Sequence, residues 1–290
     1  MRELLQRDGP LISPGVYDCI SARVVEQAGF DCAFISGAAV AASVLGYPDV
    51  GLDTMPEVLA QARNIARTVD IPVLVDVGTG YGNAINVIRT VEEFEKAGLA
   101  GIFIEDQTSP PRCGHFEGRQ VIPAEEMVVK IQAAREVRRD EGFIIIARTD
   151  SRVVYGVADA IERAHRYRQA GADLTYVEGL LDVAELRRVG REVPEPLLAN
   201  VGDEAGSLPA IPFADLYAMG YKLISYSGTL QRSAIRSMQH ALEVLRTDGT
   251  TNSMYPERIA SLAERSELLC LDEYLALDKR LYGPLLEARR

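Results

Sequence analysis

Polar side chains that could carry out chemistry stand at the ends of short apolar runs rich in Val and Ile. Eight such runs occur along the chain, and the residues that end them are Tyr17, Ser36, Asp76, Glu105 with Asp106 beside it, Arg148, Glu178, Asn200 and Tyr226. Acids, an amide and a guanidinium recur here more consistently than random surface residues would. Part of the pattern has a simpler cause, because strand ends meet water and the following loops are polar. If the runs are parallel strands, however, their carboxyl ends meet at one face and predict a site there.

Two of these residues, Asp76 and Glu105, end the third and fourth runs. In neighbouring parallel strands they would lie about 5 Å apart. Two carboxylates that close repel each other unless a cation or a proton lies between them. Oxygen ligands favour Mg²⁺ or Mn²⁺ over zinc, so a divalent ion is the economical interpretation. The alternative is a carboxylate pair neutralised by Arg148.

The segment 108–121 is longer than the usual connection of two to six residues between a strand and a helix. Long loops at this position are often lids over an active site. This loop contains Arg112, Cys113, Gly114 and His115 in succession. The Cys113 thiol could serve as a nucleophile or a proton donor. An incidental cysteine is the competing interpretation.

Stretches with helical periodicity separate the apolar runs, among them residues 87–96, 124–138, 157–169 and 214–219. A short repeat also places a Gly two or three residues before a strand, in AGF-DCAFIS, AGL-AGIFIE, AGA-DLTYVE and MGY-KLISYS. Such a Gly ends a helix in the left-handed conformation and allows a tight turn. Eight alternations of strand and helix favour a closed (β/α)8 barrel, a TIM barrel. A doubly wound open sheet is the alternative, but no GxGxxG fingerprint follows a strand.

We expect two parts in the chain: a barrel domain over residues 1–247 and a helical extension over residues 248–290. The extension carries two helical patterns, at residues 257–269 and 271–286. It is too long to serve only as a cap on the barrel.

The charge balance limits the classes of partner. The chain of 290 residues has 31 Lys and Arg against 42 Asp and Glu, a formal charge of −11. This excess argues against binding to nucleic acid or to anionic membranes. An anionic substrate must therefore be attracted by a local metal ion or Arg cluster. With no signal peptide and no apolar run of about 18 residues, we expect a cytoplasmic protein with reduced thiols.

Seven segments between Pro14 and Asn200 carry a family resemblance: PGVYDCISA, ISGAAVAASVLGYPD, DVGTGYGNAINVIRT, IEDQ, RCGH, IIARTD and LLAN. The chain resembles the isocitrate lyase and phosphoenolpyruvate mutase superfamily, most closely its methylisocitrate-lyase-like branch. The resemblance implies a (β/α)8 barrel whose last helix is exchanged with a neighbouring subunit. It also implies a homo-oligomer, commonly a homotetramer built as a dimer of dimers.

The resemblance further implies roles for individual residues. Asp76 would bind Mg²⁺, or Mn²⁺ as an alternative ion, with Asp49 and Glu105 holding its waters. Cys113 would be the general acid or base, and Glu105, Arg148 and His115 complete the expected catalytic set. Arg148 would also pair with the carboxylate of a 2-oxo acid. The other expected substrate contacts are Ser36, Gly37, Ala38, Gly114, Glu178, Asn200, Arg232 and Arg265.

Two positions depart from the family pattern. Where relatives usually read Asp-x-Asp-x-Gly-[Tyr/Phe]-Gly, the second Asp is Gly78 here, and where they usually have a Lys two residues before the cysteine, this chain has Pro111. The first change removes a carboxylate near the expected metal, and the second removes a lysine often implicated in proton transfer. Both changes point toward altered metal binding or altered chemistry.

We therefore expect a Mg²⁺-dependent carbon–carbon lyase that cleaves a small 2-hydroxy di- or tricarboxylate of the 2-methylisocitrate or 2-alkylmalate type. One alternative keeps the site but changes the reaction, to an oxaloacetate hydrolase or decarboxylase or a phosphonomutase. The RCGH motif favours a lyase over the ordinary mutase. Another alternative is a barrel that binds carboxylates but has lost catalysis, which Gly78 and Pro111 favour.

Overall fold

The computed structural model describes residues 1–114, 116–201 and 211–287. The chain divides into two compact units, Met1–Gln231 and Arg232–Arg290, and each is described by itself.

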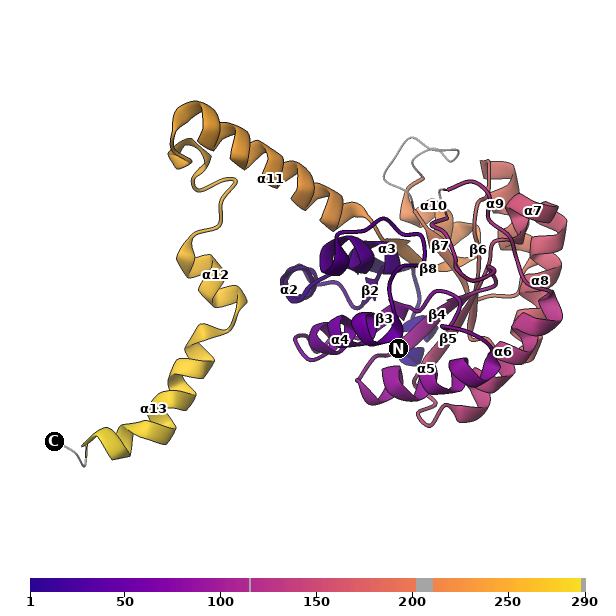
Figure 1. Cartoon of the computed structure of the whole chain (residues 1–290), viewed down its shortest axis with the longest axis horizontal. Helices are drawn as coiled ribbons and strands as arrows, with labels where there is room; N and C mark the ends of the chain where they lie inside the picture. Colours follow the sequence, from indigo (N-terminus) through magenta and orange to yellow (C-terminus); the bar gives the residue numbers. More distant parts are fainter. Residues whose placement is uncertain (115, 202–210, 288–290) are drawn as a thin grey trace. The chain divides into compact units, whose positions relative to one another are not determined.

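Eight strands within the described residues form a closed barrel in which each strand is parallel to its two neighbours (Figure 1). They are β1 (Leu11–Val16), β2 (Ala33–Ile35), β3 (Val73–Asp76), β4 (Gly101–Glu105), β5 (Ile144–Thr149), β6 (Leu174–Val177), β7 (Leu197–Asn200) and β8 (Tyr221–Tyr226). The strand order follows the sequence, and β1 closes the ring against β8. The predicted (β/α)8 barrel is confirmed. Nearly every strand residue is buried, because helices cover the outer face and side chains fill the interior.

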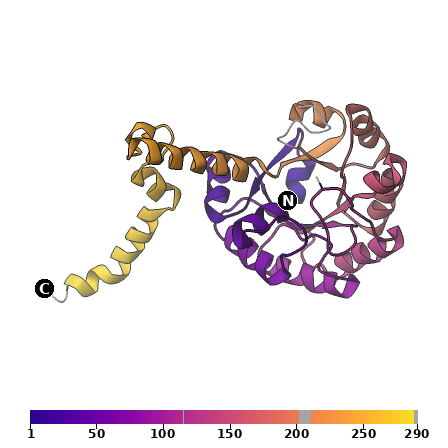
Figure 2. The same cartoon turned by 45° about the horizontal axis from the view of Figure 1, so that its top comes forward.

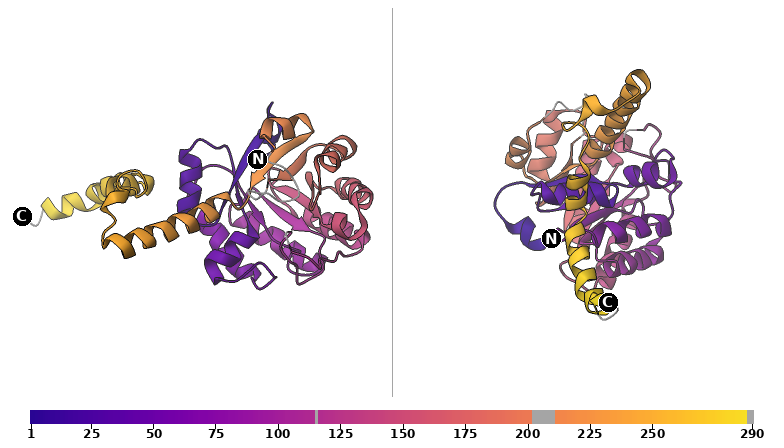
Figure 3. Two further views of the ribbon diagram at one scale, coloured as in Figure 1. Left: turned by 90° about the horizontal axis from the view of Figure 1, so that it is seen from above. Right: turned by 90° about the vertical axis from the view of Figure 1, so that its left-hand side faces the viewer.

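Helices surround the barrel, and helices that follow one another in sequence pack side by side (Figures 2 and 3). They are α1 (Arg2–Gln6), α2 (Cys19–Gln27), α3 (Gly37–Val40), the π-helical turn η1 (Ala41–Leu45), α4 (Met55–Ala66), α5 (Ala84–Lys96), α6 (Ala124–Val137), α7 (Ser151–Tyr155), α8 (Val157–Ala170), α9 (Val183–Glu192) and α10 (Phe213–Ala218). The four stretches predicted as helical from periodicity correspond to α5, α6, α8 and α10.

The predicted glycine turns explain how these helices return to the sheet. Gly29, Gly98, Gly171 and Gly220 all have positive φ, from 82° to 112°. Each follows a helix and precedes a strand by a few residues, as the repeat in the sequence predicts. A residue with a Cβ is disfavoured in this conformation, so glycine is what permits these short connections.

Aromatic side chains fill part of the barrel interior. The rings of Phe34 and Phe103 lie 5.5 Å apart in an edge-on contact, and Phe103 lies 5.5 Å from Tyr176. Leu74, Leu198 and other buried side chains belong to the same cluster. Tyr176 connects this packed interior to the carboxyl ends of the strands, because its hydroxyl donates to Glu178.

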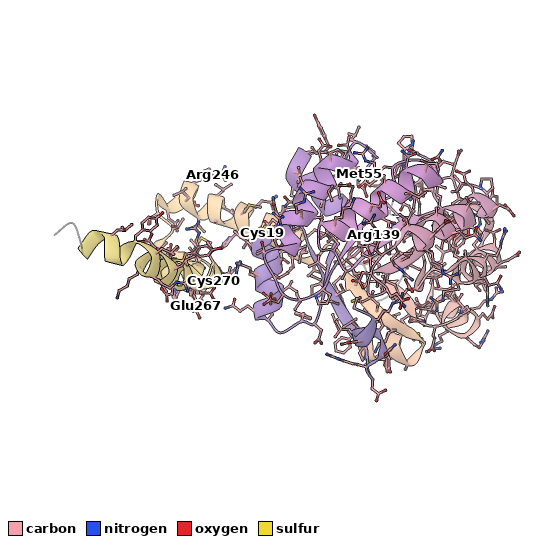
Figure 4. The ribbon with its side chains drawn as sticks, turned by 90° about the horizontal axis from the view of Figure 1, so that it is seen from below. Cys19, Met55, Arg139, Arg246, Glu267 and Cys270 are labelled. Carbon is pink, nitrogen blue, oxygen red and sulfur yellow. The ribbon has the colours of Figure 1, made fainter. Side chains whose placement is uncertain are left out.

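The second unit is helical. Helix α11 (Thr229–Asp248) starts at the end of the first unit, and η2 (Asn252–Met254), α12 (Leu262–Leu268) and α13 (Leu271–Glu287) follow. The prediction of a helix at 271–286 agrees with α13, whereas the pattern at 257–269 is helical only over α12. Helix α12 begins late because Ser261 accepts a hydrogen bond from the Glu264 N–H and caps it. Cys270 lies at the α12–α13 junction beside Glu267 (Figure 4), whose carbonyl oxygen accepts from the Cys270 N–H over 2.9 Å.

Across the described ranges, no helix combines the length and the apolar character needed to cross a membrane.

Candidate active site

The loops that follow β2, β3 and β4, together with the end of β5, enclose a polar cavity of about 100 Å³ at the carboxyl ends of the strands. Its lining residues are Gly37, Asp49, Gly51, Asp53, Asp76, Val77, Gly78, Thr79, Tyr81, Glu105, Ser109, Pro111, Arg112, Cys113 and Arg148. The position is the one that active sites occupy in TIM barrels.

Asp76 and Glu105 line this cavity together because β3 and β4 are neighbours. Asp76 is level with Phe103, and the Glu105 N–H donates to the Gly78 carbonyl oxygen over 2.9 Å. Glu105 thus lies slightly further toward the open end of the barrel than Asp76. One Asp76 oxygen accepts from the Gly78 N–H over 2.9 Å.

The carboxylates that line the cavity outnumber its two arginines, Arg112 and Arg148. Burial raises the pKa of Asp76 to about 6, although Arg148 opposes the shift. Burial also raises the pKa of Glu105 well above its usual value, again against the effect of Arg148. The pKa of Asp49 rises because of burial and the nearby charge of Asp53. A cation bound among these carboxylates would stabilise their charged forms and lower these pKa values.

Arg148 comes from the end of β5 and is oriented by acids on three sides. Its Nε and Nη2 atoms donate to the two Asp150 oxygens over 2.7 and 2.9 Å. Its Nη1 lies 3.3 Å from Glu105, and its Nη2 lies 3.6 Å from Glu178. Burial alone would lower the pKa of Arg148, but the charges of Asp150, Glu105 and Glu178 outweigh burial and raise it. The guanidinium therefore stays charged, with Nη1 directed toward the cavity side.

The Cys113 loop lies against this cluster. The Cys113 N–H donates to the Asp49 carbonyl oxygen over 3.1 Å, and the thiol hydrogen-bonds to the Asp49 side chain. A Cβ added to Gly114 would lie 2.7 Å from a Glu178 oxygen and 2.9 Å from Arg148 Nη2. A side chain at this position would displace Glu178 or Arg148, so the loop backbone packs directly against this cluster. His115 lies outside the described residues.

The other residues predicted to contact the substrate differ in how near they lie to the cavity. Gly37, at the start of α3, lies against Asp76, since an added Cβ would be 3.3 Å from Oδ2. Ser36 and Ala38 flank it in the chain but do not line the cavity. Glu178 touches Arg148, while the Asn200 side chain accepts from the Ser227 hydroxyl over 2.9 Å at the end of β7.

Asn200 and two arginines are not among the described residues that line the cavity. The arginines, Arg232 and Arg265, belong to the second unit. Their expected substrate contacts stay predictions.

The two departures from the family pattern, Gly78 and Pro111, face each other. Both line the cavity, and a Cβ added to Gly78 would lie 3.8 Å from Pro111 Cγ. The sequence shows the two changes 33 positions apart, whereas the fold places them in contact. Gly78 and Pro111 therefore change the same part of the cavity lining.

Several residues around the site were not predicted from the sequence, among them Asp53, whose carboxylate lines the cavity. Asp150 and Arg119 form a buried ion pair of 2.8 Å next to Arg148. The ARTD segment offered a signal for Asp150, which stands two residues after Arg148. The Tyr81 hydroxyl is buried at the cavity without a hydrogen-bond partner among the described residues, and Tyr81 has a positive φ of 60°. Unpaired buried polar atoms and strained backbone recur at positions that bind ligands.

The donor set fits a hard cation rather than zinc. Within the described residues, no three His, Cys, Asp or Glu side chains converge as a complete ligand set. Mg²⁺ does not require one, because it commonly uses one or two carboxylates together with water and substrate oxygens. Asp76 and Glu105 offer carboxylate oxygens in a cavity large enough for several waters.

Fold and cavity together define a TIM barrel whose carboxyl-end site is built from carboxylates, an oriented arginine and a loop cysteine. The family profile described as Phosphoenolpyruvate phosphomutase matches residues 1–246. The chain belongs to the phosphoenolpyruvate mutase and isocitrate lyase superfamily.

Two relatives illustrate the sequence similarity. The chain is 40% identical to 2,3-dimethylmalate lyase of Eubacterium barkeri over 273 residues, which cover 94% of each chain. It is 41% identical to probable 2-methylisocitrate lyase 2 of Corynebacterium glutamicum over 269 residues, 93% of this chain and 87% of that one.

Two solved structures illustrate the similarity of fold. Oxaloacetate acetylhydrolase in complex with 3,3-difluorooxalacetate superposes with a TM-score of 0.90 at 32% identity, covering 97% of this chain and 95% of that one. Phosphonopyruvate hydrolase in complex with oxalate and Mg²⁺ superposes with a TM-score of 0.85 at 28% identity, covering 96% of each chain. Members of the superfamily thus include lyases, hydrolases and mutases that act on small carboxylates.

Proposed function

We propose that the chain is a Mg²⁺-dependent carbon–carbon lyase that cleaves a small 2-hydroxy di- or tricarboxylate to a 2-oxo acid and a second carboxylate. The observation that carries the proposal is the meeting of Asp76, Glu105, Arg148 and Cys113 around one small cavity. The relatives named as 2,3-dimethylmalate lyase and 2-methylisocitrate lyase support a substrate of this class.

The carboxylates would hold the metal ion. Asp76 would bind Mg²⁺ directly, and Asp49 and Glu105 would hold its waters. When bound, the ion supplies positive charge that stabilises an oxyanion developing on the substrate. The excess of buried carboxylates around Arg148 supports this assignment.

The protein's own side chains would divide the remaining work. Arg148 would bind the carboxylate of the 2-oxo acid half and fix its orientation, since Asp150 holds the guanidinium in place. As the carbon–carbon bond breaks, a carboxylate of the cavity would accept the proton of the substrate hydroxyl. Cys113, whose thiol hydrogen-bonds to Asp49, would donate a proton to the carbanion that is left. The Gly114 backbone, packed on Glu178 and Arg148, would exclude water from that step.

Substitution of Cys113 tests the proposal. With Mg²⁺, the enzyme should release pyruvate from 2,3-dimethylmalate or 2-methylisocitrate, and Cys113→Ala should lower kcat by about 10²- to 10⁴-fold, the usual contribution of a positioned proton donor. Affinity for oxalate should change little, because the thiol does not hold the carboxylate. Cys19→Ser, at the start of α2, is the matched control and should keep full activity.

Product analysis with oxaloacetate in the same panel separates the lyase from the hydrolase. The structural similarity to oxaloacetate acetylhydrolase makes hydrolysis to oxalate and acetate the second candidate. Absence of turnover with every substrate, while oxalate still binds with Mg²⁺, would favour a binding barrel without catalysis. Unchanged turnover in Cys113→Ala would remove the cysteine from the mechanism.

We also propose that the C-terminal helices pack on a second copy of this chain. Apolar side chains lie exposed along α13, among them Tyr274 at 65%, Leu275 at 55% and Leu281 at 57%. An exposed apolar face of this extent is typical of an interaction surface.

A further inference from the structure

The carboxylate of Asp150 is shared between two arginines from different parts of the chain. Its Oδ1 atom accepts from Arg119 Nη1 over 2.8 Å and from Arg148 Nη2 over 2.9 Å, and its Oδ2 accepts from Arg148 Nε over 2.7 Å. The Asp150 side chain is fully buried, and those of Arg119 and Arg148 are 8% and 9% exposed. Breaking a buried pair of this kind is costly, because it leaves a charge without compensation.

Arg119 belongs to the loop that carries Cys113. The loop is held at its base, where the Thr108 N–H donates to the Gln120 carbonyl oxygen over 2.9 Å. Within the loop, Arg119 Nε donates to the Phe116 carbonyl oxygen over 3.2 Å. The Arg119 guanidinium therefore joins the interior of the loop to Asp150 by one continuous set of hydrogen bonds.

Asp150 itself is fixed from below. Its backbone N–H donates to Asp106 Oδ1 over 2.9 Å. The other Asp106 oxygen accepts from Thr149, Arg163 and Tyr167 over 2.7, 3.1 and 2.7 Å. Asp106 directly follows β4, Thr149 ends β5, and Arg163 and Tyr167 belong to α8, so none of these residues is part of the loop at 108–121. Asp106 thus fixes the backbone of Asp150, whereas the Asp150 carboxylate is held by Arg119 and Arg148.

We propose that Arg119 and Asp150 are positioning residues that couple the seating of the Cys113 loop to the orientation of Arg148. The proposal rests on the function proposed above, in which Arg148 binds a substrate carboxylate. Two of the guanidinium nitrogens are occupied by Asp150, so the position of Asp150 determines where Nη1 points. Without Arg119, the Asp150 carboxylate can change its position together with the Arg148 guanidinium and no longer fixes it. The loop also loses its buried ion pair.

Two measurements on Arg119→Met test the proposal. One is the affinity for oxalate with Mg²⁺ by calorimetry. The other is the rate at which iodoacetamide alkylates Cys113 in the native protein, followed by peptide mass spectrometry. We expect oxalate to bind about tenfold more weakly or worse, since small displacements of positioning groups have effects of this size. We expect Cys113 to be alkylated several-fold faster because the loop is less firmly seated.

Matched variants sharpen the result. Arg119→Lys keeps a positive charge at the position, so its oxalate affinity and Cys113 alkylation rate should lie between those of the wild type and Arg119→Met. If the Arg119 side chain only filled space, the Lys and Met variants would behave alike. Asp150→Asn keeps the shape but loses the ionic acceptor, and it should weaken oxalate binding at least as much as Arg119→Met. Arg187→Met, at an exposed position on α9, is the control and should behave as the wild type.

The outcomes separate this proposal from the proposed function. If the wild type binds no oxalate and turns over no substrate, the proposed function fails, while the alkylation rates still test the anchoring of the loop. If the wild type binds oxalate and Arg119→Met equals it in affinity and in alkylation rate, the coupling is overturned. Should Arg119→Met fail to fold by circular dichroism, Arg119→Lys and Asp150→Asn carry the same comparison.

Discussion

At the scale of single residues, Asp76 shows what it costs to bury a carboxylate in the site. Its carboxylate is held in a cavity where burial raises its pKa to about 6, from an ordinary 3.8. The folded protein therefore binds this proton more tightly than the unfolded chain does. The contribution to stability falls as pH rises from 3.8 to about 6 and then stays level, a loss of up to about 3 kcal/mol when no cation is bound.

Asp76→Asn should remove the loss of stability that ionisation of Asp76 causes. The variant keeps an oxygen that can accept from the Gly78 N–H but carries no charge. Without metal, its melting temperature should exceed that of the wild type at pH 8, and the difference should shrink below pH 5. Added Mg²⁺ should stabilise the wild type and not the variant. A variant that is less stable than the wild type at pH 8 without metal would contradict the assignment.

Gly78 is the position at which a carboxylate can be added near the proposed metal site. Its φ of 53° lies in the left-handed region, which Asp and Asn tolerate better than other residues, and the nearest atom to an added Cβ is Pro111 Cγ at 3.8 Å. Gly78→Asp should cost about 1 kcal/mol of stability and tighten Mg²⁺ binding several-fold by calorimetry. Gly78→Asn, of equal size but neutral, is the control. Equal affinities in the two variants would show that the added charge does not reach the ion.

At the scale of the elements, the barrel was predictable because its signals are local. Each apolar run became a strand, and each repeated glycine, such as Gly98 or Gly171, took the left-handed conformation. The contacts that were missed join distant segments. The Asp150–Arg119 pair and the contact of Gly78 with Pro111 each span more than 30 positions. No periodicity in the sequence encodes them, since they depend on where two loops meet above the barrel.

Helix α9 offers a test of how closely the elements pack. It carries Gly190, where an added Cβ would lie 1.8 Å from the Met219 carbonyl oxygen at the turn into β8. Gly190→Ala should therefore lower the free energy of unfolding by at least about 1–3 kcal/mol, the usual cost of overpacking, because backbone must move. Gly283→Ala in α13 is the control, as its added Cβ would meet only Lys279 at 4.0 Å. Chemical denaturation measures both, and equal stabilities would refute the packing argument.

At the scale of the whole molecule, the charge distribution favours the proposed cation. The chain has a formal charge of −11, and the cavity itself contains four carboxylates against Arg148 and Arg112. We therefore expect that neither the long-range field nor the pocket attracts an anionic substrate unless a cation is bound. The proposed substrate class and the proposed Mg²⁺ site thus depend on each other, and removing the metal should abolish oxalate binding as well as turnover.

The apolar face of α13 leads to the prediction for the assembly. Leu271, Tyr274, Leu281 and Leu285 recur at helical spacing and are 44% to 65% exposed. Such a stripe, with intervals of three, seven and four residues, is typical of a helix that packs against another surface. We expect the protein to be an oligomer by sedimentation velocity at micromolar concentration. Replacing Tyr274 and Leu281 together by Gln should reduce the mass of the sedimenting assembly. Lys279→Gln, outside this stripe, should leave that mass unchanged. A monomeric wild type, or an assembly that survives the double substitution, would exclude this face as the interface.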